Sequence, residues 1–123
     1  MKILLDAMGG DKAPDANIKG AVKAINDIKA EVILIGNEQI IKAKVKEFYG
    51  KEISEISPRL KIHNTTEVIE MEDIPTQAIK HKKDSSMVVG FNMLKSGEGD
   101  VFISAGNSGA LLTGATLLVG RIK

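Results

Sequence analysis

The stretch DVFISAGNSGALLTGATLLVG, Asp100–Gly120, decides the fold of this chain. It carries no charged residue after Asp100, so it must be buried either in protein or in lipid. Eleven of the twenty residues that follow Asp100 are Val, Phe, Ile, Leu or Ala, and the others are Gly, Ser, Thr and Asn, which is too polar a mixture for a typical membrane span. We therefore predict a buried strand over Val101–Ser104, a turn over Ala105–Gly109 and a helix that begins near Ser108 or Gly109.

The chain before this stretch alternates short β-rich runs with helical patterns. The expected strands are Lys2–Ala7, Glu31–Gly36 and Arg59–Asn64, and the expected helices are Pro14–Lys29, one from Asn37 to Gly50 and one from Asp84–Ser86 to Gly97. The apolar residues that these helices should bury include Ile18, Ala21, Val22, Ile25 and Ile28, then Ile41, Val45 and Phe48, then Met87, Phe91 and Leu94. The segment Lys51–Pro58 is expected to be a surface connection with room for a helical turn, and Thr65–Asp84 receives no assignment. Four β-rich runs separated by helices favour an α/β fold with a mostly parallel sheet.

The composition limits the class of protein. With 123 residues, the chain is expected to be one domain or a piece of one. Seventeen basic and sixteen acidic residues give a net charge of +1, so the overall charge gives no support for a nucleic-acid partner. The chain has no cysteine, which excludes a disulfide and a thiolate nucleophile within it. Since Met1–Ile3 leads directly into a strand, we expect a cytoplasmic protein without a signal peptide.

Three polar loops are expected at the carboxyl ends of the strands, where open parallel sheets bind their ligands. The loop Gly106–Gly109 offers glycine, an amide and a hydroxyl at a helix start, which suits a phosphate or an oxyanion but equally suits an ordinary helix cap. It matches neither a P-loop nor a dinucleotide fingerprint, so no nucleotide cofactor is expected.

The other two loops carry charge. Lys82–Ser86 places two lysines and two serines at a helix start, which fits an anion site or a solvated surface. Asp6–Asp11 places two carboxylates around a tight turn, where they could orient a lysine or a metal, or Asp11 could cap the next helix. His63 and His81 lack the spacing of metal ligands, and we expect no metal site.

Four motifs resemble one known family, the bacterial acyl-ACP:phosphate acyltransferases of phospholipid synthesis, also called the PlsX family. The matching residues are Leu5–Asp11 with Ala13–Asp15, Glu67–Ile69 with Met71 and Pro75, Lys82–Met87, and Ser104–Ala110. They occur in the family's order, up to the ending Gly120–Ile122. Ser108 stands where the family more often has threonine, and His81 stands where a basic residue is usual. Because members of the family are longer, the chain is expected to be the N-terminal portion of their single α/β domain.

The resemblance implies a Rossmann-like three-layer α/β/α enzyme, usually a homodimer. It implies transfer of a fatty acyl group from acyl carrier protein to inorganic phosphate, in the cytoplasm and possibly at the inner face of the membrane. Phosphate itself can attack the thioester, so no enzyme nucleophile is needed and the protein has to position phosphate and stabilise the oxyanion.

We assign three groups of candidate site residues on this hypothesis. The catalytic residues are Asn107, Ser108 and Lys83; the residues that bind phosphate or the oxyanion are Gly106, Gly109, Lys82, Ser85 and Ser86; those that shape the pocket are Asp6, Gly9, Gly10, Asp11 and Asp84. No cofactor is expected. Two alternatives stay open, namely a non-catalytic module that binds phosphate or a carrier protein, and a phosphotransacetylase-like or decarboxylating-dehydrogenase-like enzyme with another substrate.

Overall fold

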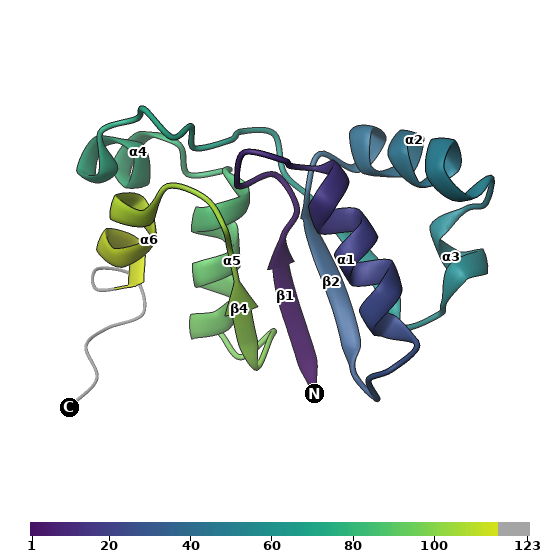
Figure 1. The fold of residues 1–123 in the computed structure, drawn as a ribbon. Coiled ribbons are helices and arrows are strands. Elements are labelled where there is room, and N and C mark those ends of the chain that lie inside the picture. The colour runs from purple at the N-terminus through teal and green to yellow at the C-terminus, as the bar shows by residue number, and fades with distance from the viewer. Residues whose placement is uncertain (116–123) are drawn as a thin grey trace.

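The computed structural model describes residues 1–115 and contains a four-stranded sheet with helices on both of its faces (Figure 1). In chain order, the elements are β1 (Lys2–Asp6), α1 (Asp15–Ile25), β2 (Glu31–Gly36), α2 (Glu38–Tyr49), α3 (Ile53–Ile56), β3 (Leu60–Asn64), α4 (Pro75–His81), α5 (Ser86–Lys95), β4 (Val101–Ile103) and α6 (Ser108–Gly114). All four predicted strands are therefore confirmed.

The sheet is parallel throughout and has the strand order β3-β2-β1-β4. The first strand lies in the middle, where Leu5 pairs with Leu34 of β2 on one side and with Ile103 of β4 on the other. Because every strand points the same way, the loops that follow β1, β2, β3 and β4 all leave from one end of the sheet. The predicted α/β class with a mostly parallel sheet is confirmed.

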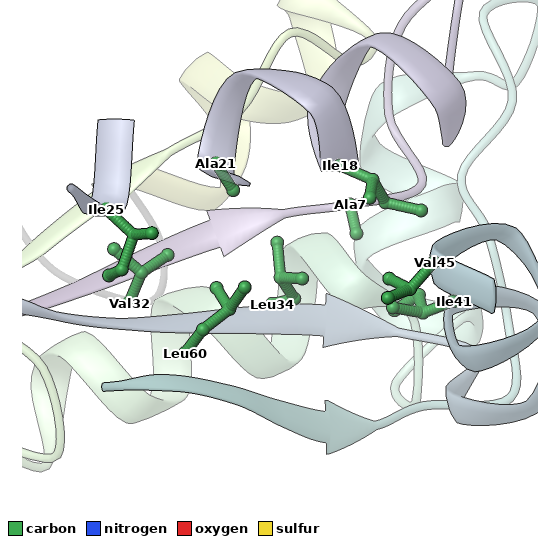
Figure 2. Close-up of a cluster of buried hydrophobic side chains, with 9 residues drawn as sticks. All are labelled: Ala7, Ile18, Ala21, Ile25, Val32, Leu34, Ile41, Val45 and Leu60. Carbon is green, nitrogen blue, oxygen red and sulfur yellow. The ribbon is translucent and has the colours of Figure 1, made fainter. Parts of the chain in front are cut away.

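Side chains alternate between the two faces of the sheet, and both faces carry helices. On one face, Leu34 packs in a cluster with residues of α1 and α2 (Figure 2). The buried members of this cluster are Ala7, Ile18, Ala21, Ile25, Val32, Leu34, Ile41, Val45 and Leu60. On the other face, Leu4 and Ile35 pack against Met93 of α5. A parallel sheet needs apolar cover on both sides, and this arrangement gives the three layers expected of a Rossmann-like fold.

Helix α1 ends earlier than the sequence suggests. The apolar spacing predicts a helix to Lys29, whereas the helix stops at Ile25 and Asn26 forms its C-cap. The cause lies far away in the chain, because the Arg59 guanidinium donates hydrogen bonds to the carbonyl oxygens of Ile25, Ile28 and Ala30. Of these carbonyl groups, a helix continued to Lys29 would have paired only that of Ile25 internally, and Arg59 satisfies it instead.

The unassigned segment 65–84 contains a helix that the sequence did not reveal. Helix α4 begins at Pro75, the favoured first position of a helix, and it buries only Ala78 and Ile79. Two buried residues in seven give too short an apolar pattern to recognise. The possible helical turn in Lys51–Pro58 is confirmed as α3. In α5, Met87 and Phe91 are buried as predicted, whereas Leu94 is only partly buried and Met93 is buried beside it.

The positions of the strand and the helix predicted after Asp100 are confirmed, but the predicted burial of the strand is wrong for the described residues, because Val101 and Ile103 are 40% and 50% exposed. Strand β4 ends at Ile103, and α6 begins at Ser108 with Asn107 as its N-cap. Among the described residues, no helix is both long enough and apolar enough to span a bilayer. Residues 116–123, which include Thr116–Gly120 of this stretch and the family-like ending, lie outside the described part.

Candidate functional site

The carboxylate of Asp6 connects three separate segments at the carboxyl end of the sheet. Asp6 ends β1 and its side chain is 1% exposed. Its Oδ1 accepts hydrogen bonds from the backbone N–H groups of Met8 and Gly9, at 3.0 and 3.1 Å, and from the Ser86 hydroxyl at 2.5 Å. Its Oδ2 accepts from the Ser104 hydroxyl at 2.8 Å. One buried carboxylate thereby holds together the loop after β1, the start of α5 and the end of β4.

The loops after β1 and β4 touch through their backbones. A Cβ atom added to Gly9 would lie 3.0 Å from both Cα and N of Gly106 and 2.6 Å from Asp6 Oδ2. Gly10 has a φ of +105°, a conformation that other residues rarely adopt, and its α-carbon faces Ala105. Both glycines of the first motif therefore serve this close approach, consistent with their assignment as residues that shape the site.

Ser85 and Ser86 are buried at the start of α5. The Ser85 side chain accepts a hydrogen bond from the Val88 N–H and caps the helix, while Ser86 donates to Asp6. Their exposed fractions are 0% and 2%. Because neither hydroxyl reaches the surface, this placement argues against direct contact of either one with a bound ligand. Both residues instead hold the loop that precedes α5 in place.

Asn107 is also buried, and both polar atoms of its side chain are hydrogen-bonded within the protein. Its Oδ1 accepts from the Ala110 N–H and caps α6, and its Nδ2 donates to the carbonyl oxygens of Glu70, Met71 and Asp73 at 3.0 to 3.2 Å. The side chain therefore ties α6 to residues 70–73, a segment more than thirty positions earlier. An anion at this turn would therefore be bound by backbone N–H groups or by neighbouring residues, and not by the Asn107 side chain.

The start of α6 still presents backbone donors. The Gly106 N–H is bonded to Ser104 Oγ, but Gly109 is exposed and its N–H has no hydrogen-bond partner within the described residues. Gly109 also lies against Pro75 of α4, where a Cβ atom would meet the proline ring at 2.6 Å. Glycine at this position thus keeps α4 and α6 in contact.

Lys82 holds the same segment that Asn107 holds. Its ammonium group donates to the Val68 carbonyl at 2.8 Å and pairs with Asp73 Oδ2 at 2.6 Å. The Asp73 carboxylate also accepts from the Glu70 N–H at 2.8 Å. The bond from Lys82, assisted by the Glu70 N–H, lowers the pKa of Asp73 below its ordinary value. Lys82 and Asn107 thus both hold the segment of residues 68–73.

Lys83, Asp84 and Asp11 are all exposed but differ in their contacts. Asp84 accepts from both the N–H and the hydroxyl of Thr66, at 2.9 and 2.5 Å, and fixes the beginning of the 66–73 segment. Lys83 and Asp11 have no hydrogen bond or ion pair with other described residues. Asp11 does not cap α1, because Pro14 occupies the N-cap position. His63 and His81 are both exposed, as expected for surface histidines.

The structure adds three residues that the motifs did not single out for the site, namely Ser104, Asn17 and Asp73. Ser104 could have been found, because the register that pairs Leu5 with Ile103 brings the next residues, Asp6 and Ser104, together. Asn17 donates from α1 to the carbonyl oxygens of Asp6 and Gly9. Nothing in the sequence marks Asp73 as part of the site, since its pairing with Lys82 depends on the fold of a segment without an apolar pattern.

The Asp73–Lys82 pair gives a prediction about pH. Because the pKa of Asp73 is lowered in the folded state, the stabilisation from this carboxylate is complete above its ordinary pKa of 3.8 and is lost as the pH falls through the folded value. We expect Asp73→Asn to be less stable than the parent at pH 6, and we expect the difference to shrink below pH 3.8. Urea unfolding of both proteins between pH 6 and pH 3 measures this, and a difference that stays constant would refute the pairing.

Comparison with known proteins gives a consistent picture. A family model described as "Fatty acid synthesis protein" matches residues 1–123. Similar proteins include three named "Phosphate acyltransferase", from Acetivibrio thermocellus with 53% identity, and from Clostridioides difficile and Caldanaerobacter subterraneus, each with 50% identity. Each match covers 100% of this chain and 35% of the relative's own length. The chain thus spans about a third of the curated relatives that it matches.

Proposed function

The chain belongs to the fatty acid synthesis protein family, and on that premise we propose that it is part of a phosphate acyltransferase. The enzyme would form an acyl phosphate from inorganic phosphate and a fatty acyl thioester of acyl carrier protein. A phosphate oxygen attacks the thioester carbonyl carbon, the C–S bond breaks, and the carrier leaves as its thiol after taking up a proton. The name shared by the relatives supports the reaction type.

The structural observation that carries the proposal is the assembly around Asp6. One buried carboxylate joins the loop after β1, the start of α5 and the end of β4. Lys83 lies in the loop before α5, and the exposed Gly109 lies at the start of α6, directly after the loop that follows β4. In Figure 1, these loops lie at the same end of the sheet. This end follows the carboxyl termini of the parallel strands, where such sheets bind their ligands.

The assembly suits a reaction that needs positioned donors rather than a nucleophile. The chain has no cysteine, and attack by phosphate requires only that phosphate and the developing oxyanion be held in place. We assign direct contact with phosphate or the oxyanion to Lys83 and to the Ser108–Gly109 start of α6. Asp6, Ser86 and Asn107 would act as positioning residues, since their side chains are already bonded within the protein.

The family resemblance supports two further parts of the proposal, a homodimer and a peripheral association with the membrane. For the dimer, sedimentation equilibrium is the appropriate measurement. The association would run through the family's partner acyltransferase, so flotation with phospholipid vesicles is measured with and without that acyltransferase, and a protein that stays unbound in its presence would remove that part.

To test the proposed reaction at the relatives' full length, we define a full-length hybrid in which these 123 residues replace the matched third of the Acetivibrio thermocellus relative. In this hybrid, Ser108→Asp places a negative charge at the start of α6. We expect the KM for phosphate to rise by at least about tenfold, because the new carboxylate repels phosphate at short range. The measurement is the initial rate of acyl phosphate formation against phosphate concentration.

The matched control is Ser54→Asp, which adds the same charge to an exposed serine of α3 and should leave the KM unchanged. An unaltered KM in folded Ser108→Asp would remove α6 from the phosphate site. A hybrid that binds acyl carrier protein and phosphate but forms no product would support a binding module instead of an enzyme.

A further inference from the structure

A strap formed by residues 66–73 runs between β3 and α4 across the carboxyl end of the sheet (Figure 1). It forms neither a helix nor a strand of the sheet, and Ile69 is its only buried residue. Apolar burial therefore fixes little of the strap. Its position over the loops of the candidate site depends mainly on hydrogen bonds and on one ion pair.

The first half of the strap is bonded to the loop that carries Lys83. The Glu67 N–H donates to the Asp84 carbonyl at 3.1 Å, and the Asp84 N–H donates back to the Glu67 carboxylate, also at 3.1 Å. On the other side of Lys83, the Lys82 ammonium donates to the Val68 carbonyl at 2.8 Å. Both sequence neighbours of Lys83 are thus bonded to the strap, whereas Lys83 itself is exposed.

The second half of the strap is bonded to the start of α6. The Asn107 amide donates to three carbonyl groups of the strap, at 3.0 to 3.2 Å. Asp73 connects the two attachments, because its carboxylate pairs with Lys82 at 2.6 Å and its carbonyl accepts from Asn107 at 3.0 Å. Among the groups that the structure describes, no hydrogen bond joins residues 82–84 directly to Asn107 or Gly109.

We propose that the strap sets the spacing between Lys83 and the Gly109 N–H, and that Asp73 is a positioning residue for the phosphate that these groups would bind. This inference rests on the proposed function. The strap is attached to Lys82, next to the first donor, and to Asn107, two residues before the second, so a shift of the strap would move both donors. A displacement of about 1 Å in such a site can lower the rate about a hundredfold.

The Asp73–Lys82 pair can be changed without disturbing the core. The Lys82 and Asp73 side chains are 31% and 26% exposed, and ion pairs in contact with water contribute little to stability. The sign of the effect on phosphate separates positioning from charge. Removing a carboxylate reduces the repulsion of an anion and frees Lys82 to bind it, so charge alone predicts tighter phosphate binding. Displacement of the strap predicts weaker binding.

The test is Asp73→Ala in the full-length hybrid, with initial rates measured against phosphate and against the acyl carrier protein thioester. We expect the KM for phosphate to rise by about tenfold and the KM for the thioester to stay unchanged, because only the phosphate donors are displaced. A general loss of folded enzyme would lower kcat without this split. The matched control is Glu72→Ala, which removes an exposed carboxylate of the strap that has no hydrogen bond or ion pair with other described residues. It should not raise the KM for phosphate.

Lys82→Met tests the pair from its other partner and replaces Asp73→Ala if that variant does not fold. We expect the same rise in the KM for phosphate, and no further rise in the double variant, because both changes break one pair. Lys82→Arg keeps a cation that can bond to Asp73 and should have a KM close to the parent's. A KM that rises in Lys82→Met but falls in Asp73→Ala would make Lys82 a phosphate ligand and would overturn the proposal.

A binding measurement separates this proposal from the proposed reaction. Isothermal titration calorimetry gives the Kd for inorganic phosphate in the parent hybrid, in Asp73→Ala and in Glu72→Ala, without acyl thioester. If the parent binds phosphate but forms no acyl phosphate, the proposed reaction fails, and a higher Kd in Asp73→Ala alone still supports the role of the strap. An unchanged or lower Kd in Asp73→Ala overturns that role, whether or not the hybrid is active. A parent that binds no phosphate overturns both proposals.

Discussion

Replacing Asp6 by alanine is expected to destabilise the fold by about 3–5 kcal/mol, the largest effect of any single change at this site. The substitution removes an acceptor that is 1% exposed and leaves four donors, the N–H groups of Met8 and Gly9 and the hydroxyls of Ser86 and Ser104, without their partner. Unsatisfied donors in a buried site cost far more than the net gain from forming the same bonds. Urea denaturation of the 123-residue chain measures the change in the free energy of unfolding.

Two matched variants separate the role of Asp6 from the loss of a charge. Asp11→Ala removes an exposed carboxylate of the same loop and should change stability by less than about 0.5 kcal/mol. Ser86→Ala removes one donor and should cost about 1 kcal/mol, which is small enough to study if Asp6→Ala cannot be purified. Equal stabilities of Asp6→Ala and Asp11→Ala would show that the carboxylate does not hold the three segments together.

The second large effect is expected for Asn107→Asp. The change keeps an oxygen that can cap α6 through the Ala110 N–H, but it replaces the amide group that donates to the carbonyl oxygens of Glu70, Met71 and Asp73. A carboxylate oxygen facing three carbonyl oxygens in a buried position is repelled by all of them. We expect a loss of about 2–4 kcal/mol in the free energy of unfolding.

The loss should be local as well as global, because Asn107 holds residues 70–73 in place. Limited proteolysis should cut this segment faster in Asn107→Asp than in the parent, and amide hydrogen exchange should accelerate at Ala78 and Ile79 of α4. Asn107→Ser provides the control for capping, since it keeps a capping oxygen without adding charge. If Asn107→Ser, which loses the same three donated hydrogen bonds, were as stable as the parent, the contacts with residues 70–73 would not matter.

The fold was largely predictable because its main elements carry local signals. The buried runs of β1 and β2 and the capped starts of α2, α5 and α6 are visible in the sequence, and the structure has all of them. The predictions were wrong or missing where residues far away in the chain determine whether a helix forms or where it ends. Arg59 ends α1 at Ile25 although the apolar pattern continues, and α4 depends on packing against α6, which no local pattern reveals.

The same division applies to the site. The motifs identified loops that the fold brings together at one end of the sheet, but sequence alone could not tell an exposed donor from a buried support. Ser85, Ser86 and Asn107 are ordinary capping and hydrogen-bonding residues by type, and only the fold shows that their side chains are used within the protein. Lys82 and Lys83 are neighbours with the same chemistry, yet Lys82 pairs with Asp73 while Lys83 is exposed.

The most direct test of the account is the location of bound phosphate. Inorganic phosphate is titrated into the ¹⁵N-labelled full-length hybrid at constant ionic strength, and the amide chemical shifts of residues 1–115 are followed. We predict saturable shifts at Lys83 and Gly109, next to the segments that Asp6 joins. A separate hollow, whose charged lining residues are Lys12, Lys19 and Lys44 together with Asp11 and Asp15, offers the competing location. Saturable shifts confined to that hollow, or no saturable shifts at all, would contradict the account.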